Sequence, residues 1–282
     1  MDLGSIPKVM SKKLTMIEIK DYHKYTELMK NGCYDKLFFI DKIFGKWDSL
    51  VDFGCADGFI TRIIASLFPE KIIIGYDNNL EMIELAKSAG DIPKNLVFTN
   101  DIRFAEEAHV ILLSSITHEI YSYQNSEQIK AFWEMVFNYK RKYVVLRDMM
   151  ESFNKEMMWT NIQEKAVKQY FEDKKLSDKV KEFEDIYGTI SRPNNLLHIM
   201  IKYLYMNSVN WKRELNENYL ALNNHILSYL GVIPINFITT YNEQYILPYL
   251  KHRWFKDFNI RGPVPMPMNT HGKFIFKNTN YE

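Results

Sequence analysis

The residues of this chain that are best suited to chemistry gather around one glycine-rich segment, residues 52–58, with the sequence DFGCADG. A short apolar run ends at Phe53 and an amphipathic pattern begins at Phe59, which predicts a turn between a strand and a helix. Glycines at such a turn let the backbone approach a ligand closely, and the helix N-terminus supplies free N–H groups. Asp77 closes a second apolar run about 20 residues later, where a carboxylate is placed to bind a ribose hydroxyl pair. The spacing indicates a site for a nucleoside-containing cofactor.

The segment that follows the fourth predicted strand holds the candidate catalytic residues, His118 and Glu119. A histidine titrates near neutrality and can take a proton from a hydroxyl or an amine, and Glu119 is expected to orient it. The alternative is that His118 caps a loop while Glu119 pairs with a surface lysine. Arg147 and Asp148, at the end of the fifth predicted strand, are a second candidate pair, and a structural ion pair is the favoured interpretation there. Position 122 is serine, so the second histidine of a zinc-protease motif is missing and no metal site is predicted.

Strand and helix patterns alternate through the first half of the chain, after a helical lead-in predicted within 12–45. Such alternation favours a parallel sheet with helices on both faces, and ligands bind such sheets at the carboxyl ends of the strands. The predicted strands are 49–53, 71–76, 95–98, 109–114 and 142–147, with helices at 59–68, 79–89 and 125–138. The second half is predicted to hold helices within 151–187 and at 194–206, 211–220, 222–230 and 242–258, and strands at 233–239 and 271–277.

The pattern divides the chain into four predicted parts. They are a helical lead-in, a cofactor-binding core, a helical insertion and a completion of the sheet that carries a basic aromatic helix, at residues 1–48, 49–150, 151–230 and 231–282.

Composition narrows the class of protein. The chain has 282 residues, 46% of them hydrophobic, which is enough to bury one large core. The net charge of +1 argues against a protein that binds nucleic acid through overall charge. Two cysteines cannot build a disulfide framework, so a reducing, cytoplasmic location is expected. No apolar stretch approaches the roughly 20 residues of a membrane span, and no membrane partner is predicted.

The motif Asp52-x-Gly54-x-x-x-Gly58, followed by Asp77, resembles class I S-adenosylmethionine-dependent methyltransferases, in which alanine is common at the position of Ala56. The resemblance covers roughly residues 48–148 and implies S-adenosylmethionine as cofactor. It implies an α/β fold with a Rossmann-like, mostly parallel sheet of seven strands whose last strand is antiparallel, helices on both faces and a helical insertion. Nicotinamide or flavin enzymes of the Rossmann type stay an alternative, as does a strand–turn–helix unit without cofactor.

The resemblance also implies a role for individual residues. Gly54 and Gly58 would form the turn against the methionine end of the cofactor, Asp52 would organise that turn, and Asp77 would hold the ribose. The other residues implied to line the cofactor site are Asn78 and Asp101 at the adenine edge, Ile102 over the ring, Ala56 in the turn and Ser114 facing the reacting methyl.

The methyl acceptor is less well defined by the sequence. Residues 192–282 carry ten Lys or Arg against five Asp or Glu, and residues 249–256 interleave aromatic rings with cations, which suits an RNA strand. An amphipathic helix packed on the sheet explains the same pattern. The three hypotheses are an O- or N-methyltransferase acting on RNA, a small-molecule methyltransferase with a helical lid, and a non-catalytic partner subunit. The candidate substrate contacts are Tyr121, Tyr123, Arg253 and Trp254.

Overall fold

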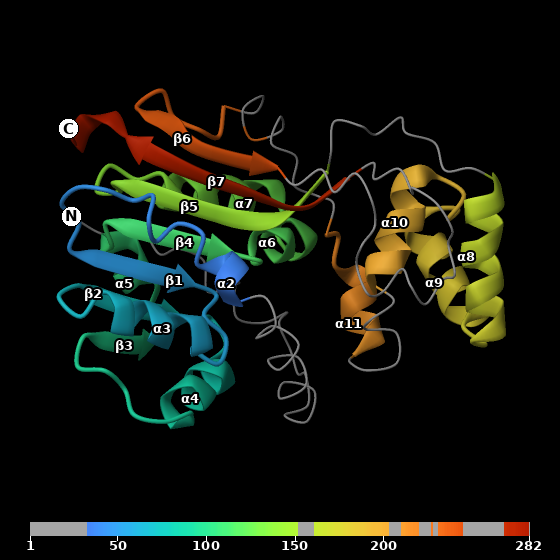
Figure 1. The fold of residues 1–282 in the computed structure, drawn as a ribbon, viewed down its shortest axis with the longest axis horizontal. Coiled ribbons are helices and arrows are strands. Elements are labelled where there is room, and N and C mark those ends of the chain that lie inside the picture. Colours follow the sequence, from blue (N-terminus) through green and yellow to red (C-terminus); the bar gives the residue numbers. More distant parts are fainter. Residues whose placement is uncertain are drawn as a thin grey trace.

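The computed structural model of the chain describes residues 33–151, 161–202, 210–219, 227, 231–244 and 268–281. Within these residues, seven strands form one sheet in the order β3-β2-β1-β4-β5-β7-β6 (Figure 1). The strands are β1 (Ser49–Phe53), β2 (Ile72–Tyr76), β3 (Leu96–Thr99), β4 (Val110–Ser114), β5 (Tyr143–Glu151), β6 (Phe237–Gln244) and β7 (Met268–Asn278). The neighbours among β1 to β5 pair in parallel, and β7 runs antiparallel to both β5 and β6. The predicted seven-stranded, mostly parallel sheet is therefore confirmed.

The central strands are apolar on both faces because helices cover both sides of the sheet. Side chains alternate along a strand, so Val51 and Phe53 join one core with the helix at Ser126–Val136, while Leu50 joins the opposite core with the helices at Phe59–Leu67 and Leu80–Ser88. The helices around the sheet are α2 (Cys33–Lys36), α3 (Phe59–Leu67), α4 (Leu80–Ser88), α5 (Ile102–Glu107), α6 (Thr117–Tyr123) and α7 (Ser126–Val136).

A second group of helices, which we call the helical lobe, lies beyond the carboxyl ends of β1, β4 and β5 (Figure 1). It comprises α8 (Asn161–Asp173), α9 (Ser177–Tyr187), α10 (Pro193–Lys202), α11 (Trp211–Asn216) and the residues that follow α11 as far as Tyr219. The lobe has an apolar core of its own, to which Phe171, Phe183 and Ile199 contribute, and Met149 from β5 packs against it. The lobe therefore stands over the edge of the sheet where ligands bind in such folds.

Several local predictions are wrong. The strand predicted at 233–239 begins only at Phe237, and the helix predicted at 211–220 ends at Asn216. Residues 37–42 form turns instead of continuing a helix to 45, and the part of that helix before residue 33 lies outside the described residues. The segments 102–107 and 117–123 are helices that the sequence pattern does not reveal, because each spans only one or two turns. Residues 242–244 are strand, since an irregularity between Thr239 and Tyr241 lets β6 stay paired with the long strand β7. The rest of the helix predicted at 242–258 lies outside the described residues.

Among the described residues no helix has the length and apolar character needed to cross a membrane. Cys33 and Cys55 are both free thiols, and Cys55 is buried.

Candidate active site

The glycine-rich turn between β1 and α3 holds three residues in the left-handed backbone region. Their φ angles are +82° at Gly54, +49° at Ala56 and +71° at Gly58. The N–H groups of Gly54 and Cys55 donate to the carbonyl oxygen of Tyr76, at 2.8 and 2.9 Å, which joins the turn to the end of β2. A left-handed conformation costs a residue with a side chain about 1–2 kcal/mol, so Ala56, the one residue of the three that is not glycine, is strained.

Gly58 is also fixed by crowding. A Cβ atom at this position would lie 2.4 Å from Cζ of Phe98, whereas a Cβ at Gly45, which has φ of +93°, would meet nothing within 4 Å. We therefore expect Gly58→Ala to lower the free energy of unfolding by about 2–4 kcal/mol, from strain and overpacking together. Gly45→Ala, the matched control, carries strain alone and should cost about 1 kcal/mol. Urea denaturation measures both, and equal losses in the two variants would contradict the steric argument.

Asp77, at the end of β2, is hydrogen-bonded to the glycine turn. Its Oδ2 atom accepts from the N–H of Ala56 at 3.0 Å, and its Oδ1 atom accepts from the N–H of Asn79 at 2.9 Å. Burial raises the pKa of this carboxyl, and the two backbone N–H donors and Arg213 oppose the rise. Each carboxylate oxygen keeps a further lone pair for a ligand hydroxyl. The exposed residue Asn78 follows directly.

Asp52 lies beneath the turn and is buried. It accepts a hydrogen bond of 2.7 Å from the hydroxyl of Thr61, which ties the end of β1 to α3. Burial raises the pKa of Asp52 to about 6. This contact supports the turn from below, on the side away from solvent.

The remaining residues proposed for the cofactor lie at the ends of β3 and β4. Asp101 caps α5 by accepting a hydrogen bond of 3.1 Å from the backbone N–H of Arg103. The Asp101 carboxylate also forms an ion pair with the Arg103 guanidinium. Ile102 packs against the core on the α7 side. The Ser114 hydroxyl is buried without a hydrogen-bond partner in the described part of the chain. A buried polar group without a partner is costly, and a ligand atom at this edge of the sheet would satisfy it.

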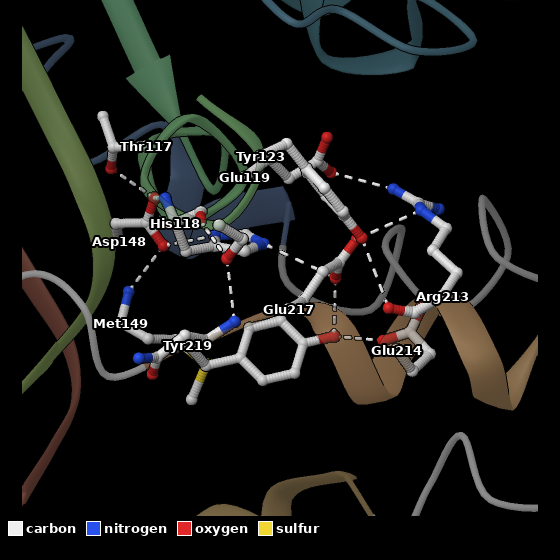
Figure 2. A network of polar contacts seen from close by, with 12 residues as sticks. Thr117, His118, Glu119, Tyr123, Asp148, Met149, Arg213, Glu214, Glu217 and Tyr219 are labelled. Carbon is white, nitrogen blue, oxygen red and sulfur yellow. Dashed lines mark hydrogen bonds and ion pairs between the residues drawn. The ribbon is translucent and has the colours of Figure 1, made fainter. Parts of the chain in front are cut away.

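His118, in the first turn of α6, forms a buried pair with Asp148 of β5 (Figure 2). Asp148 Oδ1 lies 2.8 Å from His118 Nδ1, and Asp148 Oδ2 accepts from the His118 N–H at 3.1 Å and from the hydroxyl of Thr117. Burial alone would lower the pKa of His118, but Asp148, Glu217 and Glu119 outweigh it and raise that pKa to about 9. The histidine is therefore positively charged at neutral pH and has no free site for a proton.

The predicted partners of two residues are wrong. Asp148, not Glu119, orients His118, because residues i and i+1 of a helix do not face each other. Arg147 and Asp148 do not pair, because consecutive strand residues point to opposite faces. Arg147 instead pairs with Asp35 at 2.6 Å.

Glu119 reaches across to the helical lobe. Its Oε1 atom accepts from Nη2 of Arg213 at 3.0 Å, and Arg213 Nε lies 3.1 Å from Glu217 Oε1 (Figure 2). The Tyr123 hydroxyl contacts Glu217 Oε1 and the carbonyl oxygen of Arg213, both at 3.3 Å. Tyr219 completes the network, with its hydroxyl 3.0 Å from Glu217 Oε2.

Tyr121, another candidate substrate residue, does not join this network within the described part of the chain. The Tyr121 hydroxyl accepts from the indole N–H of Trp133 at 2.9 Å, so this ring is packed on α7. Arg253 and Trp254 lie outside the described residues. Sequence reasoning missed Arg213, Glu217 and Tyr219, whose only signal is a run of charged residues in a helix-forming stretch.

No protein-family model matches the chain. It is 24% identical to the malonyl-[acyl-carrier protein] O-methyltransferase of Bacillus anthracis over 118 residues, which are 40% of this chain and 44% of that protein. The chain thus spans less than half the length of that relative.

Solved structures of similar fold include a SAM-dependent methyltransferase from Archaeoglobus fulgidus, with a TM-score of 0.49 and 10% identity over 91% of this chain and 99% of that one. Another is the plantazolicin methyltransferase BamL in complex with a desmethylPZN analog and SAH, with a TM-score of 0.48 and 12% identity over 92% and 88%. The observed sheet, with its antiparallel β7, is the one that the resemblance to class I S-adenosylmethionine-dependent methyltransferases implies, so the predicted fold is confirmed.

Proposed function

We propose that the chain is an S-adenosylmethionine-dependent methyltransferase with an oxygen or nitrogen acceptor. The observation that carries the proposal is the left-handed turn at Gly54–Gly58, hydrogen-bonded to Asp77 at the carboxyl edge of a sheet of this class. The Ser114 hydroxyl, which has no hydrogen-bond partner among the described residues, lies at the same edge and fits a site that a ligand completes. The name of the sequence relative, an O-methyltransferase, supports the same reaction type.

The chain's own residues account for binding and alignment. Asp77 would hold the ribose hydroxyls, the glycine turn would face the methionine end, and Asp101 with Ile102 would contact the adenine. The cofactor supplies a methyl group already activated by its sulfonium. The protein's main contribution is therefore to hold the acceptor in line with that methyl and to exclude water.

The described residues favour a small acceptor, or the end of a flexible one, over a folded RNA. The helical lobe is fixed over the strand ends by partly buried contacts from α6 to Arg213 and Glu217, and such a cover suits a pocket with a lid. The RNA hypothesis rests on residues 249–256, which lie outside the described part of the chain. The third hypothesis, a partner subunit without catalysis, requires that the cofactor does not bind.

Isothermal titration with S-adenosylhomocysteine and S-adenosylmethionine tests the donor site, and we expect micromolar affinity for both. Absence of binding at high micromolar ligand would overturn the proposal and favour the partner-subunit hypothesis. Methyl-labelled cofactor with pools of metabolites, protein extract and total RNA then tests the acceptor, and we expect label in the metabolite or protein pool. Label in RNA, with affinity that falls steeply with salt, would overturn the small-acceptor assignment.

A further inference from the structure

The position of Glu119 relative to the glycine turn follows from its place on α6. A Cβ atom at Gly54 would lie 2.9 Å from Cδ1 of Ile116, so the start of α6 packs directly on the turn. The N–H of Glu119 donates to the carbonyl oxygen of Ile116 at 3.0 Å. Residues i and i+3 share one face of a helix, so Glu119 lies one turn further along the face that contacts Gly54.

The two oxygens of the Glu119 carboxylate differ. Oε1 accepts from Arg213, whereas Oε2 has no hydrogen-bond partner among the described residues, and Figure 2 shows it pointing away from the guanidinium. The side chain is 16% exposed, compared with 6% for His118 and 3% for Glu217. Of these three groups, Glu119 is the one that a ligand can reach.

The guanidinium that holds Glu119 comes from the helical lobe and is itself fixed. Arg213 Nε pairs with Glu217, and its carbonyl oxygen accepts from Tyr123. A planar guanidinium held at two edges leaves its partner little freedom. The geometry of Glu119 therefore depends on the lobe being docked on α6.

Charge effects agree with this geometry. Burial, together with Glu217 and Asp77, raises the pKa of Glu119 to about 7 against the opposing effects of Arg213 and His118. A base with a pKa near the working pH is best suited to accept a proton, whereas His118 is already protonated.

We propose that Glu119 is the proton acceptor of the methyl transfer and that Arg213, supplied by the helical lobe, is the residue that positions it. The inference rests on the proposed function and assigns a role within the same site. As the acceptor's lone pair forms the bond to the methyl carbon, the carbon–sulfur bond breaks with its electron pair going to sulfur. The proton of the acceptor's O–H or N–H group passes to Glu119 Oε2, which leaves a neutral carboxylic acid.

The test uses the donor alone and does not require a known acceptor. S-adenosylmethionine carries a positive sulfonium, whereas S-adenosylhomocysteine has a neutral thioether. A carboxylate beside the reacting methyl therefore makes the protein bind S-adenosylmethionine more tightly than S-adenosylhomocysteine. We expect Glu119→Gln to weaken S-adenosylmethionine relative to S-adenosylhomocysteine by about fivefold at pH 8, the size of a charge interaction over several ångströms in a partly solvated site. In the wild type this preference should increase as pH rises through about 7, when Glu119 loses its proton, and in Glu119→Gln this increase at about pH 7 should be missing.

The role of Arg213 has its own readout. Arg213→Met removes a cation that lowers the pKa of Glu119, so the midpoint of the pH-dependent preference should move to higher pH. In Arg213→Lys a cation is kept, so the midpoint should lie between those of Arg213→Met and the wild type. Glu134→Gln, at a surface pair with Lys130 on α7, is the control that should match the wild type. An unchanged midpoint in a folded Arg213→Met variant would overturn the positioning role.

The outcomes separate the two proposals. If the wild type binds neither ligand, the proposed function fails. If both ligands bind and Glu119→Gln keeps the wild-type preference at every pH, the assignment of Glu119 is overturned while the methyltransferase proposal stands. Circular dichroism on each variant confirms that the comparison is between folded proteins.

Discussion

Replacement of Asp77 by asparagine is expected to weaken S-adenosylhomocysteine binding by about 100-fold. Two hydrogen bonds from ribose hydroxyls to a carboxylate are each worth about 1.5–3 kcal/mol, and an amide keeps at most a part of that. A loss of about 3 kcal/mol corresponds to roughly two orders of magnitude in affinity. Isothermal titration of the wild type and the variant measures the change.

The same substitution should leave the fold intact. Because the pKa of Asp77 is raised in the folded state, its charge opposes folding above the ordinary carboxyl pKa, and a neutral amide removes that penalty. The asparagine oxygen can still accept from one of the N–H groups of Ala56 and Asn79. Asp41→Asn, on an exposed side chain paired with Lys42, is the matched control. Full affinity in Asp77→Asn, or equal loss in the control, would refute the ribose role.

The proposed donor half of the site is predictable from sequence because its parts are close in the chain. The strand, the left-handed turn and Asp77 lie within one strand–helix–strand unit, and the spacing of glycine and acid carries the geometry. The short helices α5 and α6 escape prediction because too few residues show a helical period. Asp101 illustrates this: its carboxylate caps α5, a role that becomes visible only once the helix is known.

The proposed acceptor half is not predictable in the same way, because its contacts join distant segments. Glu119 and Arg213 are 94 residues apart in sequence, and His118 and Asp148 are 30 apart. No local pattern specifies which of two adjacent residues faces which partner. Once α6 is known to be a helix and β5 a strand, the assignments follow: His118 and Glu119 diverge around the helix, and Arg147 and Asp148 point to opposite faces of the sheet.

The buried pair of His118 and Asp148 leads to the second large effect, on stability. Asp148→Asn should lower the free energy of unfolding by about 3–5 kcal/mol, because it leaves the imidazolium buried without its counter-charge. His118→Gln removes the other partner and should cost a similar amount. In the double variant the losses should be clearly less than additive, since each single change already removes the same interaction. Urea denaturation at pH 6.5 measures all three, and additive losses would show that the two residues act independently.

The pH dependence of stability gives the pair a signature of its own. The pKa of His118 is raised to about 9, so its contribution is full below about 6.5 and is lost as pH rises through 9. The pKa of Asp148 is lowered to about 2, so its contribution is present above the ordinary carboxyl pKa and is lost as pH falls through 2. Between pH 6.5 and 9 the free energy of unfolding of the wild type should therefore fall by up to about 3 kcal/mol relative to that of His118→Gln, in which no imidazole titrates at this position. Glu217 and Glu119 also face the imidazole, so Glu217→Gln should reduce this slope without abolishing it. A difference between wild type and His118→Gln that stays constant over this range would show that the histidine is neutral in the folded protein, and it would then again be available as the base.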